Sequence, residues 1–200
     1  MSDDTVKIEG SRVLVPDRPV IPYIEGDGIG PEIWSATRLV IDAAVQRAYG
    51  GSRSIQWEEI MAGKKAHELS REWLPEKTVE RIRACAVAMK GPLATPVGEG
   101  IRSINVQLRK ILKLYAGVRP IRHLRGVPCP VKDPDCVDMI VFRENMEDVY
   151  AGIEWRSGSS EARDIISYIK ERTGYAIDPS SGLGIKPISE FNTKNQVRRV

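Results

Sequence analysis

Apolar residues recur at helical spacing in three stretches of this sequence. The first covers residues 33–48, the second begins at Trp73-Leu74-Pro75 and ends near Arg83, and the third covers residues 160–173. Spacings of three and four residues place such side chains on one helix face, so each stretch predicts an amphipathic helix packed on a core. The candidate core positions are Leu39, Val40, Ala43, Ala44 and Val45 in the first helix, and Ile165, Ile166, Tyr168 and Ile169 in the third.

Short apolar runs between the helices predict strands. One begins near Val20, and others cover residues 54–60, 86–90, 118–122, 137–142 and 182–188. Pro22 places the first strand at a sheet edge or near a strand start, because proline cannot donate a main-chain hydrogen bond. Residues 1–18 and 123–135 are predicted to be irregular. Strands that alternate with helices of this length are typical of an α/β domain.

The stretch from Gly91 to Pro120 joins a glycine- and proline-rich loop to a further amphipathic helix. Its apolar stripe comprises Ile104, Leu108, Ile111, Leu112 and Tyr115. Asn105 and Arg109 are four residues apart on a different face, and Ser103 stands at the N-cap position. Hydroxyl, amide and guanidinium groups therefore meet near a helix N-terminus, which favours an anion. A small anionic ligand is the favoured interpretation, and a solvated face with an ordinary cap is the alternative.

Two more arginines and a tyrosine follow this stretch. Arg119 ends the segment after the helix, Arg143 directly follows the strand at 137–142, and Tyr150 lies at the far edge of the next turn. A lone arginine after a strand is more often a surface residue, and a lone tyrosine is more often half-buried packing. Arg143 is nevertheless the third arginine to emerge from the end of an element, which adds to the case for an anion site.

The glycine motif GDGIGPE at residues 26–32 lies between a predicted strand and a predicted helix. A Rossmann dinucleotide fold has the fingerprint G-x-G-x-x-G at this place, but here the third glycine comes one position too early. The motif therefore predicts a tight turn with close strand–helix packing and not a Rossmann fold. Pro31 fits the first turn of the helix, and Gly50-Gly51 fits its end.

Composition narrows the function classes. With 200 residues, of which 42% are hydrophobic and 28% charged, the chain is typical of a soluble globular protein with one or two domains. The net charge of +3 is too small to favour a nucleic-acid partner, and no apolar run approaches a membrane span. Cys85, Cys129 and Cys136 lack zinc spacing and are expected to be free thiols in a reducing cytoplasm. Neither histidine is expected to act as a ligand or a base.

The end of the sequence carries a capping box, Thr193-x-x-Gln196, which predicts the start of a helix. The sequence ends at Val200, after roughly two turns, and so short an isolated helix is marginal. We therefore expect this chain to be a truncated part of a larger protein. A frayed C-terminal tail is the alternative.

Three motifs carry a resemblance to a known family: MKGPLATPVGEGIRSINVQLRK, LYAGVRP and FRENMEDVYAGIEW. With IPYIEGDGIGPEI, they resemble the N-terminal half of bacterial-type NADP-dependent isocitrate dehydrogenases, in the β-decarboxylating isocitrate/isopropylmalate dehydrogenase superfamily. The resemblance covers nearly all of the chain. It implies an incomplete α/β isocitrate/isopropylmalate dehydrogenase-like fold and oxidative decarboxylation of isocitrate to 2-oxoglutarate and CO₂ in the tricarboxylic acid cycle. The pair Ser103 and Asn105 favours isocitrate over isopropylmalate.

The resemblance also implies roles for single residues. Ser103 and Asn105 bind isocitrate, its carboxylates are held by Arg109, Arg119 and Arg143, and Tyr150 is the catalytic proton donor after CO₂ leaves. Thr95 lies near the nicotinamide end of NADP, although Ala94 stands where the family often has threonine. In some bacterial members the serine matching Ser103 is phosphorylated, and a dianion there would block substrate binding.

The family's organisation is implied in the same way. Residues 1–114 would start a large α/β domain, 115–147 a small domain and 148–192 a dimerisation clasp, with 193–200 the truncated start of a helix. Both the cofactor NADP and a Mg²⁺ or Mn²⁺ ion are implied, and the metal ligands, the partner subunit's lysine and the 2′-phosphate pocket are expected beyond residue 200. A cytoplasmic homodimer that contacts neither nucleic acid nor membrane is expected.

Three alternatives stay open. Within the same class, the protein is a relative that acts on homoisocitrate or isopropylmalate. In a different class, it is a catalytically inactive fragment that acts at most as a dimerisation module, and the 200-residue chain alone is expected to show no turnover. A nucleic-acid role is a distant third and rests on the basic balance and the Arg198-Arg199 end.

Overall fold

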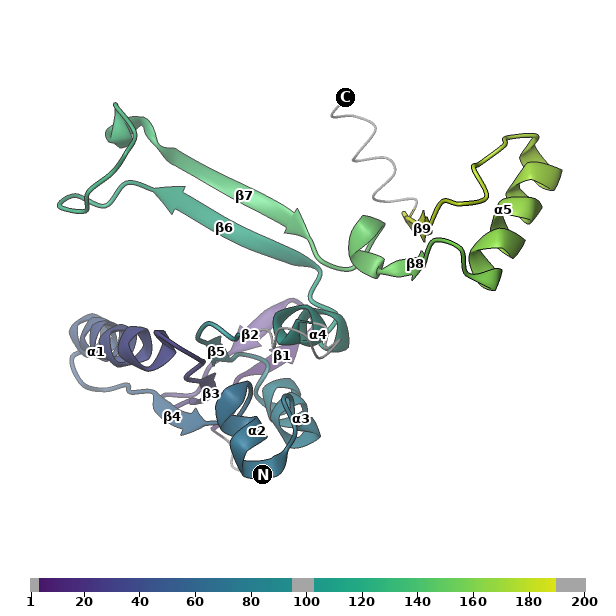
Figure 1. Ribbon diagram of the computed structural model, residues 1–200. Helices are drawn as coiled ribbons and strands as arrows, with labels where there is room; N and C mark the ends of the chain where they lie inside the picture. The colour runs from purple at the N-terminus through teal and green to yellow at the C-terminus, as the bar shows by residue number, and fades with distance from the viewer. Residues whose placement is uncertain (1–3, 95–102, 190–200) are drawn as a thin grey trace. The chain divides into compact units, whose positions relative to one another are not determined.

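The computed structural model describes residues 4–94 and 103–189. The chain divides into two compact units, unit 1 from Met1 to Leu112 and unit 2 from Lys113 to Val200. Each unit is built from its own elements and is described by itself (Figure 1).

Unit 1 is organised on a parallel sheet in the order β4-β3-β5. The strands are β3 (Val20–Ile24), β4 (Gln56–Glu59) and β5 (Met89–Lys90). Helix α1 (Gly30–Tyr49) connects β3 to β4, and α2 (Lys64–Ser70) and α3 (Glu76–Cys85) lie in the connection from β4 to β5. Parallel strands need crossover connections of this kind, so the α/β prediction is confirmed.

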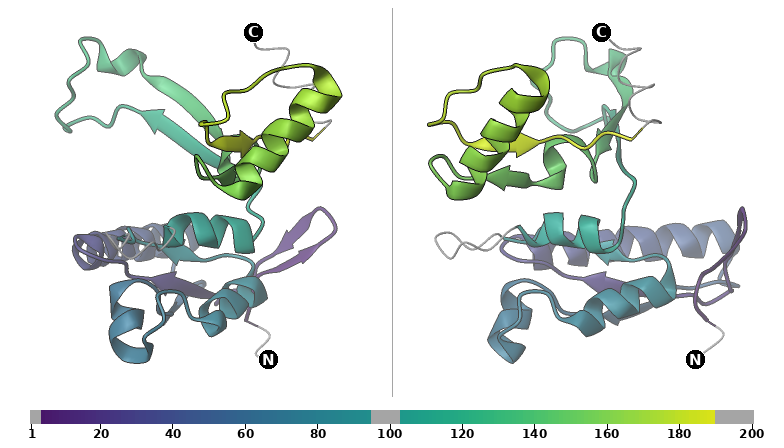
Figure 2. Two further views of the ribbon diagram at one scale, coloured as in Figure 1. Left: turned by 45° about the vertical axis from the view of Figure 1, so that its right-hand side comes forward. Right: turned by 90° about the vertical axis from the view of Figure 1, so that its right-hand side faces the viewer.

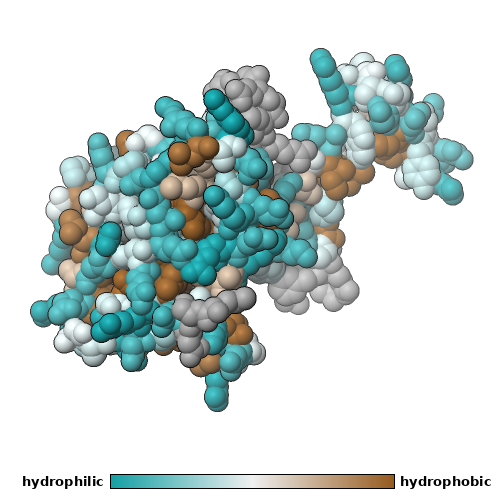
Figure 3. All heavy atoms as spheres, turned by 90° about the horizontal axis from the view of Figure 1, so that it is seen from below, coloured by the Kyte–Doolittle hydropathy of each residue, from teal (hydrophilic) through white to brown (hydrophobic). Residues whose placement is uncertain are grey.

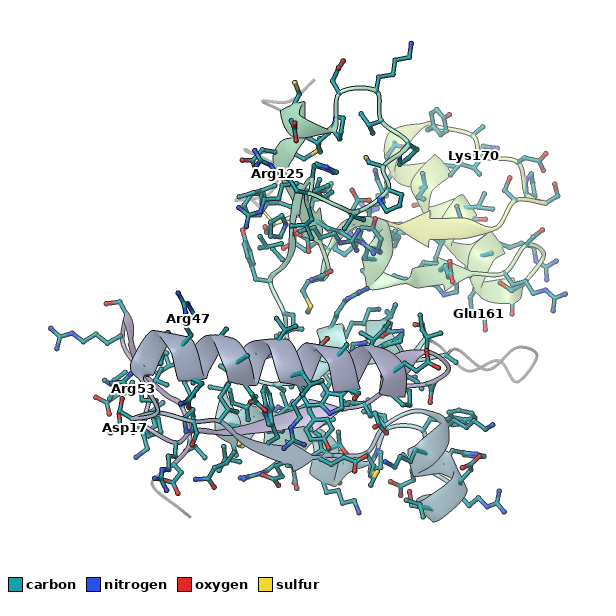
Figure 4. The ribbon with its side chains drawn as sticks, turned by 90° about the vertical axis from the view of Figure 1, so that its left-hand side faces the viewer. Asp17, Arg47, Arg53, Arg125, Glu161 and Lys170 are labelled. Carbon is teal, nitrogen blue, oxygen red and sulfur yellow. The ribbon has the colours of Figure 1, made fainter. Side chains whose placement is uncertain are left out.

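Helix α1 begins and ends at the predicted signals, but it presents a different face to the sheet. Trp34 is buried, stacks on Tyr23 with ring centroids 4.1 Å apart and meets the edge of Trp57 at 5.0 Å. Leu39 and Val40 are 71% and 69% exposed, so their predicted core position is wrong. At roughly 100° per residue they lie far around the helix from Trp34, which fixes the buried side. Figure 4 shows α1 along the strands.

The main core of unit 1 lies on the face of β3 opposite to Tyr23, because successive side chains of a strand alternate sides. Ile24 packs there against α3 and against α4 (Ile104–Ile111). Ile104 is 0% and Leu108 4% exposed. The buried members of this cluster are Ile24, Ile60, Ala62, Val79, Leu93, Ile104 and Leu108. The apolar stripe of α4 is therefore confirmed over its first two turns.

The predicted stripe does not continue beyond α4. The helix ends at Ile111, which is 40% exposed, and Lys113 adopts a left-handed conformation with φ 51°. Tyr115 lies outside the helix and is 63% exposed. Leu112 still packs against the core cluster.

Pro22 lies in the central strand and not at an edge, contrary to the prediction. Main-chain groups alternate sides along a strand: Pro19 and Tyr23 accept hydrogen bonds on the β4 side, and Ile24 accepts one from Gly91 N on the β5 side. The nitrogen of Pro22 therefore faces the β5 side. Strand β5 pairs only with Tyr23 and Ile24, so no ladder donor is lost at the proline.

Residues 4–18 are not wholly irregular, although the sequence predicted them to be. They contain an antiparallel hairpin of β1 (Lys7–Glu9) and β2 (Arg12–Leu14), whose two-residue turn starts at Gly10 with φ 60°. Glycine followed by serine is one of the short hairpin turn pairs, a signal that sequence reasoning passed over. The Arg53–Asp17 ion pair, 3.0 Å from Nε to Oδ1, connects this segment to the rest of unit 1 (Figure 4).

In residues 113–189, unit 2 contains two antiparallel ribbons, the helix α5 and two short helices. Strands β6 (Ala116–Arg122) and β7 (Asp138–Glu144) pair along their whole length, with the short helix η1 (Pro134–Cys136) in the loop between them. The short helix η2 (Asp148–Ala151) leads to β8 (Ile153–Trp155), which pairs with β9 (Leu183–Ile185). Helix α5 (Ser160–Thr173) lies beside this second ribbon (Figure 2).

Helix α5 has the predicted bounds because both of its ends carry caps. The hydroxyl of Ser159 accepts a hydrogen bond from Ala162 N, and Gly174 adopts a left-handed conformation at the C-terminus. Ile166 is buried as predicted, whereas Tyr168 is 58% exposed.

Many apolar side chains reach the surface of the described chain. Figure 3 shows hydrophobic atoms interrupting the hydrophilic surface in several places on the face that it presents. In the β6–β7 ribbon, Ile140 is 57% and Phe142 64% exposed. Of the helices in the described residues, none combines the length and the apolar character that crossing a membrane requires.

Candidate functional site

The glycine turn after β3 packs against the loop after β5 with almost no space between the main chains. Asp27 N donates to Pro92 O at 2.7 Å, and Gly91 N donates to Ile24 O at 2.8 Å. A Cβ atom at Gly26 would lie 2.4 Å from Pro92 O, and one at Gly91 would lie 2.0 Å from Glu25 O. The predicted tight turn is confirmed, and its close approach to the loop after β5 explains why glycine occupies both positions.

The carboxylate of Asp27 holds two other segments against this turn. Its Oδ1 accepts a hydrogen bond from Lys64 N at the start of α2, and its Oδ2 accepts one from Ala94 N, both at 2.9 Å. Gly63 leaves room for the carboxylate, because a Cβ there would lie 2.5 Å from Oδ2. Asp27 therefore fixes the loop that leads from β5 toward α4.

Polar side chains form a hydrogen-bonded cluster where β5 and the N-terminal part of α4 meet. Asn105 Oδ1 accepts a hydrogen bond from Lys90 Nζ at 2.9 Å, and Asn105 Nδ2 donates to Leu93 O at 3.0 Å. Lys90 Nζ also donates to Gly91 O at 2.6 Å. These hydrogen bonds fix the orientation of the Asn105 side chain: its NH₂ group donates to the loop, and its carbonyl oxygen accepts from the Lys90 ammonium.

Sequence reasoning did not single out Lys90. The available signal was its place as the last residue of a predicted strand, directly before Gly91-Pro92. Side chains at the carboxyl ends of parallel strands gather at one edge of the sheet, which is where α/β proteins bind ligands.

Burial and the positive charge of Arg109 disfavour the protonated form of Lys90. Burial of the ammonium lowers its pKa from the ordinary 10.5, the positive charge of Arg109 lowers this pKa further, and Asp27 opposes the shift. The side chain as a whole is exposed, but the surroundings of its ammonium are dense enough to desolvate it. Below the lowered pKa the charge on Lys90 therefore costs the folded state stability, and this cost disappears as the pH rises toward 10.5.

We expect a bound polycarboxylate to raise the pKa of Lys90, because an anion beside the ammonium offsets both causes of the shift. At high pH, where the lowered pKa leaves part of Lys90 unprotonated, binding of such an anion should then take up a fraction of a proton at this residue. Calorimetric titrations in buffers of different ionisation enthalpy measure this uptake. The Lys90→Met variant should lose the uptake at high pH, and an equal uptake in both proteins would contradict the expectation.

Ser103 and Arg109 complete the group of predicted site residues in unit 1. Ser103 is the N-cap residue of α4, as predicted, but its side chain makes no capping hydrogen bond. Arg109 lies on the same helix one turn after Asn105 and is half-buried. Hydroxyl, amide, ammonium and guanidinium groups thus belong to one end of unit 1, an arrangement that suits an anion.

Three further predicted site residues lie in unit 2. Gly117 pairs with Arg143 and Arg119 pairs with Val141 in the β6–β7 register, so both arginines lie on one face of the ribbon as diagonal neighbours. The guanidinium carbon of Arg143 lies 4.9 Å from the centre of the Tyr150 ring, a cation–π contact. Tyr150 itself belongs to η2 and is 40% exposed.

Some predictions fall outside the described residues. Thr95, the predicted contact to NADP, lies between the described ranges, and the Thr193 capping box lies after them. Within residues 4–94 and 103–189, no three His, Cys, Asp or Glu side chains gather closely enough to hold a metal ion. The described residues therefore do not make up a divalent-metal site.

The sequence of residues 20–197 matches the family described as isocitrate/isopropylmalate dehydrogenase. The chain belongs to this family. The α/β fold expected for an isocitrate/isopropylmalate dehydrogenase is thereby confirmed, as is the resemblance read from the three motifs. The glycine turn, the Lys90–Asn105 contact and the Arg143–Tyr150 contact all lie within the matched residues 20–197.

Three curated relatives share one name. "Isocitrate dehydrogenase [NADP]" of Staphylococcus epidermidis is 48% identical over 99% of this chain and 48% of its own length. The proteins of the same name from Staphylococcus aureus and Streptococcus salivarius are 50% and 46% identical over 92% and 98% of this chain. The chain spans about half the length of the curated relatives it matches.

Solved structures are similar as well. The crystal structure of isocitrate dehydrogenase from Methylococcus capsulatus is 35% identical and superimposes with a TM-score of 0.60, covering 90% of this chain and 45% of that one. A protein from Thermus thermophilus is 36% identical with a TM-score of 0.59, covering 90% of this chain and 31% of that one.

Proposed function

We propose that this chain supplies the substrate-recognising part of an NADP-dependent isocitrate dehydrogenase. The reaction is the oxidative decarboxylation of isocitrate to 2-oxoglutarate and CO₂, with reduction of NADP⁺. The names of the relatives from both staphylococci and from Streptococcus salivarius support this proposal over nearly the whole chain.

The observation that carries the proposal is the contact of Lys90 with Asn105 at the start of α4. It combines a partly desolvated cation with an oriented amide, one helical turn before Arg109. A tricarboxylate needs several charge-assisted donors in fixed places, and both the rigid guanidinium fork and a helix N-terminus meet that need.

In this proposal each side chain has a separate task. Ser103 and Asn105 bind the substrate, and Arg109, Arg119 and Arg143 hold its carboxylates. Tyr150 donates a proton to the substrate carbon from which CO₂ has left, so that its phenol O–H bond breaks as the new C–H bond forms. Phosphorylation of Ser103 would place a dianion where the substrate carboxylates bind and would repel them.

NADP⁺ and a Mg²⁺ or Mn²⁺ ion would supply the chemistry of the oxidation. The described residues are given no part in that step. We further propose that the complete enzyme is a cytoplasmic homodimer, with residues 148–192 as its clasp. Residues 1–114 would belong to the large domain and residues 115–147 to the small domain.

A chimera tests the proposed function. This chain is joined to the part of the Staphylococcus aureus enzyme that follows the matched region, and NADPH formation is followed at saturating Mg²⁺. We expect turnover of isocitrate, with kcat/KM at least about 100-fold above the values for isopropylmalate and homoisocitrate, because unpaired polar groups in a site penalise the wrong substrate.

The control for this experiment is the 200-residue chain alone, which is expected to produce no NADPH. A chimera that folds, as judged by circular dichroism, and prefers isopropylmalate or homoisocitrate would overturn the assignment of substrate. A folded chimera without turnover on any of the three would favour the inactive dimerisation module.

A further inference from the structure

The turn that follows β7 is organised around one oxygen atom. Oε1 of Glu144 accepts hydrogen bonds from three consecutive main-chain N–H groups, those of Asn145, Met146 and Glu147, at 2.9, 2.6 and 3.1 Å. Glu144 is the last residue of β7, so the strand ends at the residue whose side chain caps the following turn. Hydrogen bonds to a carboxylate are stronger than those between neutral groups, and three of them define the path of the turn.

This turn connects Arg143 to Tyr150. The far side of the turn is held by a different segment, because Asp148 N donates to Pro187 O at 2.9 Å and Ser189 N donates to Glu147 Oε2 at 2.8 Å. Asp148 has a left-handed conformation with φ 57°, which an aspartate adopts only where its surroundings compensate the cost. The turn is therefore anchored at both ends by specific hydrogen bonds.

The contact between Arg143 and Tyr150 is too weak to hold this geometry by itself. The guanidinium carbon is 4.9 Å from the ring centre, but the ring is 40% exposed, and cation–π contacts at exposed sites are weak. Without the Glu144 carboxylate, three N–H groups of the turn would lose their acceptor and would turn toward water or other acceptors. The position of Tyr150 relative to Arg143 therefore depends on the turn.

We propose that Glu144 is a positioning residue, which fixes Tyr150 against Arg143 through the turn at 145–147. This inference rests on the proposed function, in which Tyr150 donates a proton and Arg143 holds a carboxylate. Oε1 of Glu144 is directed to the main chain of the turn, and the residue acts on the reaction through the two side chains that it positions. A displacement of the donor by about 1 Å can lower the rate about 100-fold.

Nuclear magnetic resonance of the 200-residue chain tests the geometry without any need for turnover. We expect the Tyr150 ring to shift the side-chain resonances of Arg143 upfield, because the guanidinium lies over its face, and Tyr150→Leu identifies this shift. We expect Glu144→Ala to abolish the shift and to speed amide exchange at residues 145–147. We expect Glu144→Gln to keep most of both, because its amide oxygen can still accept. Glu171→Ala, which removes an exposed carboxylate from α5, is the matched control and should change neither.

The chimera with the Staphylococcus aureus enzyme then tests the consequence for the reaction. Glu144→Ala should lower kcat about 10- to 100-fold with a smaller change in KM for isocitrate, and Glu144→Gln should restore most of kcat. Circular dichroism and thermal unfolding establish that the variants are folded.

The outcomes separate this inference from the proposed function. An Arg143 shift that persists in Glu144→Ala overturns the role of Glu144, whatever the chimera does. A lost shift with unchanged kcat overturns the positioning role in the reaction. A parent chimera without isocitrate turnover speaks against the proposed function, while the resonance experiment still decides whether Glu144 fixes the two side chains.

Discussion

Replacing Gly91 with alanine is expected to lower the free energy of unfolding by about 3 kcal/mol, the upper end of the usual cost of overpacking. The added Cβ would lie 2.0 Å from the carbonyl oxygen of Glu25 and 2.8 Å from its carbonyl carbon. Both are main-chain atoms next to the hydrogen bond from Gly91 N to Ile24 O. A flexible side chain could rotate away from such a contact, but this main chain can move only by breaking the pairing of β3 with β5.

Urea unfolding followed by tryptophan fluorescence measures this loss, because Trp34 and Trp57 report on the sheet of unit 1. Gly50→Ala is the comparison variant: unlike Gly91, Gly50 has a left-handed conformation, with φ 56°, but its Cβ would meet open space. It should cost about 1 kcal/mol. Equal losses in the two variants would show that the close approach at Gly91 is not a strong constraint.

The Ile104→Ala substitution is expected to cost 2–5 kcal/mol, roughly the range for truncating a fully buried aliphatic side chain. Ile104 is 0% exposed and lies at the first position of α4, directly after Ser103 and before Asn105. The cavity would therefore form under the end of the helix that carries the candidate site. Affinity for isocitrate should fall together with stability.

Ile111→Ala provides a close comparison, because it makes the same chemical change in the same helix. Ile111 is 40% exposed, and alanine raises helix propensity equally at both positions. The difference between the two variants in urea unfolding therefore isolates burial, and Ile111→Ala should cost less than about 1 kcal/mol. If both variants lost the same stability, α4 would not be anchored through its N-terminal isoleucine.

Local signals predicted those parts of the fold that depend on local chemistry. The caps at Ser159 and Gly174 define α5, and Pro31 and Gly50 define α1. Helix α2 was not predicted because it has no apolar stripe: Ala66 is its buried residue, and Leu69 is 72% exposed. At its start, Lys64 N donates to the carboxylate of Asp27, which lies 37 residues earlier in the sequence. The pattern of neighbouring residues cannot reveal such a contact.

Features that depend on contacts between distant segments could not be predicted in the same way. The buried face of α1 is chosen by Trp34 stacking on Tyr23, so the apolar run at Leu39 and Val40 gave the wrong side. For the candidate site, spacing placed Asn105 and Arg109 one turn apart on the same helix, as the structure has them. It could not place Lys90 on Asn105, because that contact requires the end of β5 to lie beside the start of α4.

The carboxylate of Asp27 has a consequence for how the sequence can vary. Its two oxygens hold N–H groups that lie 37 and 67 positions farther along the chain, and it fits only because Gly63 has no side chain. Substitutions at these sites therefore share one structural cause, and their effects should not add. A change at Gly63 that displaces the carboxylate would already break these hydrogen bonds, so a second change at Asp27 would cost little further stability. We therefore expect the sequences of the three segments to vary together.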